Sequence, residues 1–166
     1  MIGKRVIETQ PLSEALGKKS EPTGHQQCLG AETLIASAKA NGIKTLLVSG
    51  GFTFFTERLR ERLGLDYAFS NHLEVIDGKL TGRVTGPLCD AAAKARHVRE
   101  AASQLGLQQE QIIVIGDGAN DLEMIREAGL SVAFRAKPMV QAQANVALNV
   151  VGLNGVLALF EKIDKL

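Results

Sequence analysis

Residues 112–124 read IIVIGDGANDLEM, and this stretch decides the fold. Its uninterrupted run of β-branched residues is typical of a strand buried on both faces of a parallel sheet. The run stops at Gly116, and Asp117 and Asp121 follow where a helix is expected to begin. Because ligands of open α/β sheets bind beyond the carboxyl ends of the strands, the two carboxylates mark a candidate site.

Short apolar strands and amphipathic helices alternate outward from this stretch, which predicts an α/β fold with a mostly parallel sheet between helical layers. In one helix Phe55, Leu59 and Leu63 follow at i, i+4 and i+8, so all three are expected in the core. Asp77-Gly78 joins two alternating runs within residues 67–86, which predicts a β-hairpin that projects as a flap. The other expected helices cover 31–42, 90–106, 121–129 and 155–163, and the other expected strands cover 44–51, 112–116, 130–134 and 144–150.

Residues 1–29 differ in composition from residues 30–166. The segment GKKSEPTGHQQ at 17–27 is polar and rich in helix and strand breakers, so this region is expected to be loosely ordered. Within it only KRVIE, at 4–8, resembles a short strand. The folded core is therefore expected to comprise residues 30–166.

Length and charge set broad limits on function. The 166 residues suit one domain, and 19 basic against 18 acidic residues favour neither nucleic acid nor an anionic membrane as a partner. No stretch approaches the ~18 apolar residues that a membrane span requires, so a soluble, cytoplasmic protein is expected. Cys28 and Cys89 show no metal-ligand spacing and receive no role.

Two features beyond the opening stretch suggest phosphate chemistry. Ser49-Gly50-Gly51 ends a predicted strand just before a helix, which suits a phosphate oxygen but also an ordinary turn. Lys94 is the single lysine in an alanine-rich helix, and it either faces solvent or neutralises a phosphoryl group at the strand ends.

The carboxylates of the opening stretch suit a hard cation. Mg²⁺ prefers a few carboxylate oxygens together with waters and phosphate oxygens, so Asp117 and Asp121 are candidate ligands. The alternative is that Asp121 caps its helix and Asp117 occupies a turn. That alternative leaves unexplained why Gly116, Gly118 and Ala119 keep the same place free of large side chains.

These motifs together resemble the phosphoserine phosphatases of the haloacid dehalogenase (HAD) superfamily. The resemblance rests on VSGGFTFF, LEVIDGKLTGRVTG, Lys94, IGDGANDLEM and FRAKP, in that order and spacing, and covers about residues 30–160. It implies a HAD-like Rossmannoid three-layer sandwich and a Mg²⁺ cofactor. It also implies hydrolysis of phosphoserine to serine and phosphate through an aspartyl-phosphate.

The resemblance also implies roles for individual residues. Ser49 and Gly50 match residues that hold phosphoryl oxygens, and Lys94 matches a lysine that orients nucleophile and phosphate. Asp117 matches a Mg²⁺ ligand. Asp121 matches an acid that supports the metal site, and Asn120 matches a residue that touches the substrate phosphate.

The chain departs from this family in its first motif. The family's nucleophile lies in a D-x-D-x-T/V motif at the end of the first, central strand, and no D-x-D occurs anywhere in this sequence. The helical cap that selects the serine moiety is missing as well. The central strand is therefore expected to be missing or replaced, which would leave costly unpaired ladders in a buried sheet.

Three alternatives address the central strand. The first is that KRVIE occupies the position of the central strand. The second is that a complementing chain or a homo-oligomer supplies the strand, and the third is that the reading frame is truncated or wrongly started. Three functions stay open with them: a phosphoserine phosphatase whose nucleophile comes from elsewhere, a catalytically silent domain that binds phosphate, Mg²⁺ or an intact relative, and a hydrolase of another phosphomonoester.

Overall fold

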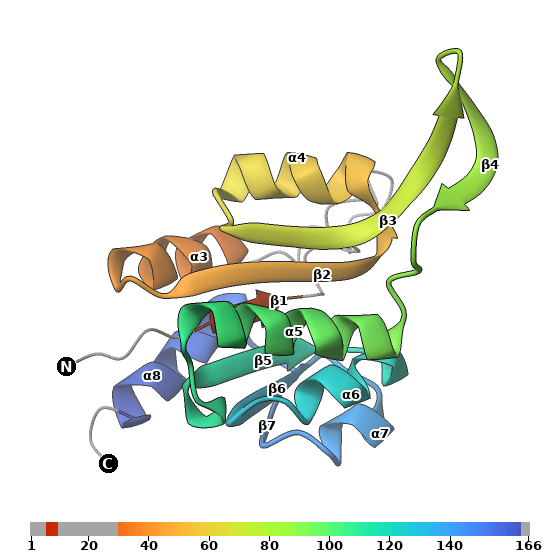
Figure 1. Ribbon diagram of the computed structural model, residues 1–166. Coiled ribbons are helices and arrows are strands. Elements are labelled where there is room, and N and C mark those ends of the chain that lie inside the picture. The colour runs from red at the N-terminus through yellow and green to blue at the C-terminus, as the bar shows by residue number, and fades with distance from the viewer. Residues whose placement is uncertain (1–5, 10–29, 164–166) are drawn as a thin grey trace.

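A seven-stranded sheet with the order β4-β3-β2-β1-β5-β6-β7 forms the centre of the computed structural model, which describes residues 6–9 and 30–163 (Figure 1). Neighbouring strands run parallel except β3 and β4, which form an antiparallel pair. The strands are β1 Val6–Thr9, β2 Lys44–Phe52, β3 Tyr67–Ile76, β4 Lys79–Thr85, β5 Ile112–Gly116, β6 Leu130–Phe134 and β7 Val146–Leu148.

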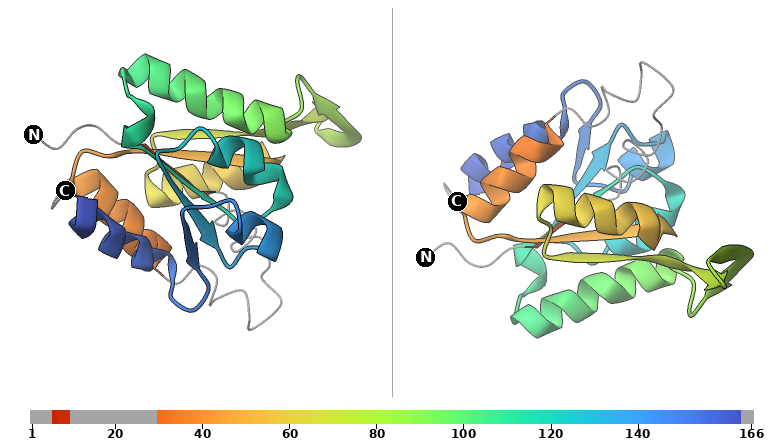
Figure 2. Two further views of the ribbon diagram at one scale, coloured as in Figure 1. Left: turned by 90° about the horizontal axis from the view of Figure 1, so that it is seen from below. Right: turned by 90° about the horizontal axis from the view of Figure 1, so that it is seen from above.

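Helices cover both faces of the sheet, as expected of a three-layer α/β sandwich (Figure 2). One face carries α3 Ala31–Ala40, α4 Thr53–Leu63 and α8 Leu157–Ile163, and the other carries α5 Ala91–Leu105, α6 Leu122–Ile125 and α7 Pro138–Gln141. Short 3₁₀ turns are η1 Gln109–Gln111, η2 Ala119–Asp121 and η3 Leu153–Val156. In the part of the chain that the structure describes, no helix has the length and apolarity to cross a bilayer.

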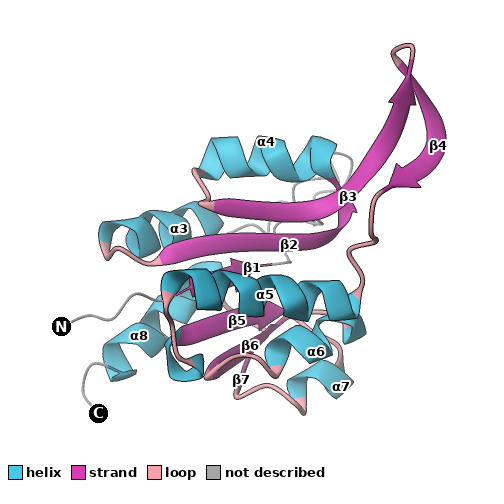
Figure 3. Ribbon diagram, in the orientation of Figure 1, coloured by secondary structure: helices cyan, strands magenta, loops and turns pink. Residues whose placement is uncertain are grey.

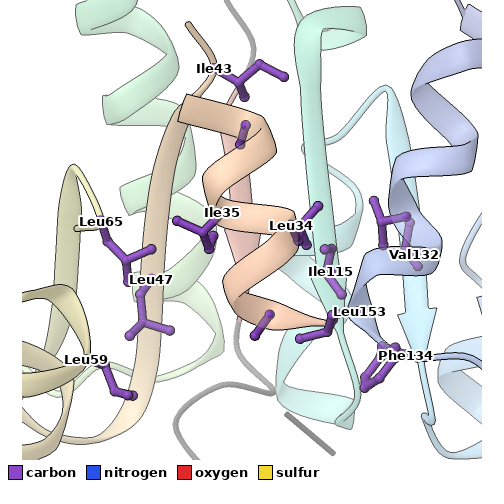
Figure 4. Close-up of a cluster of buried hydrophobic side chains, with 13 residues drawn as sticks. Leu34, Ile35, Ile43, Leu47, Leu59, Leu65, Ile115, Val132, Phe134 and Leu153 are labelled. Carbon is purple, nitrogen blue, oxygen red and sulfur yellow. The ribbon is translucent and has the colours of Figure 1, made fainter. Parts of the chain in front are cut away.

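Successive side chains of the strands point to opposite faces of the sheet and pack into two separate hydrophobic cores. Leu47 of β2 and Ile115 of β5 pack beneath α3, where Leu34 and Ile35 lie between them (Figure 4). Their neighbours Leu46 and Val114 point to the opposite face and pack against α5 and α6. Burial on both faces explains why these strands read as continuous apolar runs.

The central position of the sheet is occupied by β1. Val6 pairs in parallel register with Lys44 of β2 and with Ile112 of β5. The hypothesis that KRVIE fills this slot is therefore confirmed for its last three residues, and the described strand extends from Val6 to Thr9, whereas residues 4 and 5 lie outside the described residues. The predicted loose order of residues 1–29 otherwise falls outside the described residues.

The predicted hairpin is confirmed and projects from the end of the sheet (Figure 3). Asp77 and Gly78 have φ values of 52° and 74°, as a type I′ turn requires at both central positions. Every residue of β4 is exposed. Local turn chemistry, rather than burial, therefore determines this part of the fold.

Two predictions about helices were partly wrong. Leu59 is buried and Leu63 packs against the core, but Phe55 is 47% exposed and lies edge-to-face against Phe54. The helix expected over 121–129 is shorter, because α6 ends at Ile125 and the chain continues in i→i+3 turns. Spacing alone did not reveal that Phe54 and Phe55 lie outside the core.

Candidate phosphate and metal site

The turn after β5 folds back closely on the end of its own strand. A Cβ atom added to Gly116 would lie 2.7 Å from Cβ and 3.0 Å from Oδ2 of Asp121. A Cβ added to Gly118 would collide with Oδ1 of Asn120. The two glycines therefore make room for side chains of the following 3₁₀ turn, η2, and not for a ligand alone.

Asp121 is the centre of this turn and is fully buried. Its Oδ1 accepts a hydrogen bond from Nζ of Lys94 at 3.0 Å. Its Oδ2 accepts from the backbone N–H groups of Asp117 at 3.0 Å and Gly118 at 3.1 Å. A buried carboxylate is tolerated when a counter-charge and hydrogen bonds compensate for its lost hydration, and Asp121 has both.

Lys94 reaches Asp121 from the first turn of α5. Asp90 caps this helix by accepting from the Ala93 N–H at 2.8 Å, which fixes where the helix begins. Lys94 is 0% exposed, and Ala93 and Ala95 beside it are buried too. Of the two alternatives for Lys94, the one that it faces solvent is excluded, and the small neighbours let the ammonium group enter the protein interior.

The register of β1 with β2 and β5 predicts that Ser49 and Asp117 lie at a similar height in the sheet. Glu8 is in register with Leu46 on one side and Val114 on the other. Ser49 and Asp117 each follow these partners by three residues. With about 4.8 Å between neighbouring strands, their backbones are expected roughly 10 Å apart.

The end of β2 leaves the regular ladder at this height. Val48 pairs with Phe69 and Phe52 with Asn71, so three residues of β2 lie opposite one of β3. Within this bulge Ser49 is 2% exposed and its Oγ accepts from the Gly51 N–H at 3.0 Å. Of the N–H groups expected to meet a phosphate, that of Gly51 is therefore used internally, while Gly50 is exposed.

Asn71 was missed by the sequence reasoning. It lies in β3 and is 8% exposed, and its side chain connects Gly50 to Cys89. The available signal was an asparagine inside an otherwise strand-like segment, where this residue type is depleted.

The remaining predicted residues lie on the same turn. Asp117 is partly exposed, and its carbonyl accepts from the Lys137 N–H at 3.3 Å. Asn120 is exposed on η2. The structure thus brings Lys94 into direct contact with Asp121, and places Asp117, Asn120 and Ser49 at or just beyond the carboxyl ends of β2 and β5.

The oxygen atoms at this turn suit Mg²⁺ only as part of a coordination shell. Among the described residues, no group of three or more His, Cys, Asp or Glu side chains could hold a metal. Asp121 accepts one hydrogen bond at Oδ1 and two at Oδ2, so most of its acceptor capacity is used within the protein. Mg²⁺ usually keeps several waters and takes one or two carboxylates plus phosphate oxygens. The residues fit such an ion at Asp117 and do not form an all-protein cage.

Residues 8–126 match the family of haloacid dehalogenase-like hydrolases. The chain belongs to this family. The resemblance inferred from the motifs is therefore confirmed, and the match begins within β1 and ends after α6.

Within this family, the chain is similar to proteins named phosphoserine phosphatase. A phosphoserine phosphatase of Polaromonas sp. is 53% identical over 78% of this chain and 57% of its own length, and one of Streptococcus thermophilus is 42% identical over 99% and 76%. A probable phosphoserine phosphatase from Vibrio cholerae, solved unliganded, superposes with a TM-score of 0.78 at 32% identity, over 94% of this chain and 64% of that one. The chain spans a little more than half the length of the first curated relatives that it matches.

Proposed function

We propose that this chain carries the phosphate- and Mg²⁺-binding part of a phosphoserine phosphatase, which hydrolyses O-phosphoserine to serine and phosphate in cytoplasmic serine biosynthesis. The observation that carries the proposal is the fully buried pair of Lys94 and Asp121 beneath the turn that presents Asp117. A buried cation at the carboxyl edge of a parallel sheet suits a doubly charged phosphoryl group. Relatives named phosphoserine phosphatase support the choice of substrate.

Four residues are assigned to the phosphate. The hydroxyl of Ser49 and the exposed backbone of Gly50 bind its oxygens at the end of β2, and Asn120 approaches from η2. Lys94 offsets its charge from α5. Because Asp121 accepts from Lys94 and from two backbone N–H groups, it holds the cation and the turn in one arrangement, which preorganises the site.

Asp117 is assigned as the carboxylate that holds Mg²⁺, with Asp121 in support. When bound, the ion supplies charge neutralisation and polarisation at the phosphoryl oxygens. Replacing a metal ligand or its support commonly lowers affinity on the order of 10- to 100-fold. Asp117→Asn is therefore expected to weaken Mg²⁺ binding by about 10-fold or more.

The attacking group separates this proposal from a second candidate. Covalent phosphoryl transfer requires a nucleophile, and the D-x-D motif that supplies it in the family is absent from the sequence. This absence favours, as the second candidate, a silent domain that binds phosphate and Mg²⁺ or associates with an intact relative. A hydrolase of another phosphomonoester keeps the same site and changes only the substrate.

One assay distinguishes these functions. Phosphate release from O-phosphoserine with Mg²⁺ is compared among the parent chain, Asp117→Asn and the control Asp77→Asn. The control makes the same substitution in another Asp-Gly dipeptide, which lies in the exposed hairpin turn. Activity that is lost only in Asp117→Asn supports the proposal. Phosphate release only from other phosphomonoesters would show that the chain is a hydrolase with a different substrate.

If no monoester is cleaved, binding becomes the measurement. Calorimetry with Mg²⁺ and inorganic phosphate supports the silent domain when both ligands bind and Asp117→Asn weakens Mg²⁺ binding. Equal Mg²⁺ affinity in the parent and in Asp117→Asn would refute the metal assignment.

A further inference from the structure

We infer that Asn71 is a positioning residue that locks the phosphate-binding end of β2 to the start of α5, the helix that carries Lys94. This inference rests on the proposed phosphate site and extends it to a residue that does not touch the phosphate.

The bulge in β2 creates a need for a side-chain partner. Between the pairs Val48–Phe69 and Phe52–Asn71, the residues of β2 cannot continue the regular ladder with β3. Backbone groups left without ladder partners bond instead to side chains or to water. Nδ2 of Asn71 donates to the carbonyl oxygen of Gly50 at 2.8 Å and so replaces a lost ladder bond.

The other end of the same amide holds the segment before α5. Oδ1 of Asn71 accepts from the backbone N–H of Cys89 at 2.8 Å. Cys89 directly precedes Asp90, the cap of α5, and Lys94 lies in the first turn of that helix. At 8% exposure, an asparagine with both ends of its amide bonded has little freedom to move.

The contacts form a continuous path through the site. Gly50 is tied through Asn71 to Cys89, and α5 then leads to Lys94, whose ammonium binds Asp121. Asp121 in turn holds the N–H of Asp117. The phosphate-binding end of β2 and the cation are thereby fixed relative to each other although they lie on different elements. Since errors of about 1 Å in such geometry can cost on the order of 100-fold in rate, this link positions the site.

Asn71→Ala and a matched control test the inference. Asn145→Ala is the control because Asn145 also joins two segments of the sheet, with Oδ1 accepting from N and Oγ of Ser131 at 2.8 and 2.7 Å. Ser131 lies at the amino end of β6, away from the carboxyl edge. Both variants remove side-chain hydrogen bonds, but only Asn71→Ala is expected to disturb the site.

Two measurements on the whole chain are compared. For inorganic phosphate with Mg²⁺, Asn71→Ala is expected to weaken affinity on the order of 10-fold, whereas Asn145→Ala changes it less than about twofold. Without ligand, amide hydrogen exchange at Gly51 and Cys89 is expected to accelerate in Asn71→Ala and not in Asn145→Ala. Asn71→Asp keeps the acceptor for Cys89 and loses the donor to Gly50, so Cys89 should stay protected while the affinity still falls.

The two measurements can also contradict the positioning role of Asn71. Equal losses of phosphate affinity in Asn71→Ala and Asn145→Ala would show that Asn71 acts only through overall stability and would overturn the inference. If the parent chain binds no phosphate, the proposed function fails, and the exchange data alone judge Asn71. Exchange at Gly51 and Cys89 that is no faster in Asn71→Ala than in Asn145→Ala overturns the link in that case as well.

Discussion

Two aspartate–lysine pairs lie at opposite ends of the same sheet. At the carboxyl end, Asp121 accepts from Lys94 and from two backbone N–H groups. At the amino end, Asp66 accepts from Nζ of Lys44 at 2.7 Å and from N and Oγ of Thr45, both at 2.9 Å. In each case one carboxylate is held by one ammonium group and by two further donors.

Burial and location separate the two pairs. The side chains of Lys94 and Asp121 are 0% exposed, whereas those of Lys44 and Asp66 are 43% and 23% exposed. The backbone donors of Asp121 lie in the turn that presents Asp117. The pattern of donors therefore does not identify a functional site by itself, and the proposed assignment rests on the position of the Lys94–Asp121 pair at the carboxyl edge.

The pKa of the Asp66 carboxyl reflects its structural role. Burial acts to raise this pKa, but the hydrogen bonds from Lys44 and Thr45 outweigh it, so the pKa lies below its usual value of 3.8. The same hydrogen bond raises the pKa of the Lys44 ammonium. Both shifts favour the charged pair in the folded protein.

The largest expected effect comes from breaking the buried pair. Asp121→Asn leaves the ammonium of Lys94 without its counter-charge and turns an amide N–H₂ toward at least one donor. Removing one partner of a buried ion pair costs about 3–5 kcal/mol, so the free energy of unfolding in a urea titration should fall by about that amount. A change below about 1 kcal/mol would show that this pair is dispensable for folding.

Crowding the same turn should have the next largest effect. In Gly116→Ala the new methyl group would lie 2.7 Å from Cβ of Asp121, and rotation of the Asp121 side chain does not move its Cβ, so the contact can be relieved only by a shift of the backbone. Overpacking of this kind costs about 1–3 kcal/mol in the free energy of unfolding. Gly50→Ala is the control, since among the described residues its Cβ would approach only the Cys89 oxygen, at 3.7 Å, and should cost much less. Equal losses in the two variants would contradict the close packing over Gly116.

At the amino end, Asp66→Asn should cost less, about 1 kcal/mol, because the site is partly hydrated. The depressed pKa makes this contribution depend on pH. Between 3.8 and the lower folded-state value the unfolded chain binds more protons, so stability falls as the pH drops through this window. The stability difference between parent and Asp66→Asn should therefore shrink below about pH 4. A constant difference down to pH 2 would count against this assignment.

The smallest effect is expected for Lys44→Met, which removes the exposed partner. Asp66 keeps both donors of Thr45, so the change in stability should be smaller than for Asp66→Asn. The pKa of Asp66, followed by NMR titration, should rise. An unchanged pKa would show that the Thr45 donors alone account for its depression.

Local patterns predicted much of the fold. The Asp77-Gly78 turn and the buried strand at 112–116 were each confirmed. The prediction that Phe55 lies in the core was wrong, because helical spacing identifies a face of the helix but not the extent of the core beneath it. For the site, sequence reasoning found Asp121 and Lys94 but not their mutual bond across 27 residues, and it missed Asn71.

By itself the sequence determined the element types, the hairpin and the residue types at the strand ends, because periodicity and turn chemistry depend on neighbouring residues. Only the tertiary structure decided that β1 fills the centre of the sheet, that Lys94 is buried against Asp121 and that Asn71 joins Gly50 to Cys89. These features depend on the register and burial of segments far apart in the chain. Burial strengthens the hydrogen bonds of Lys94 and Asn71 and holds both side chains in one position.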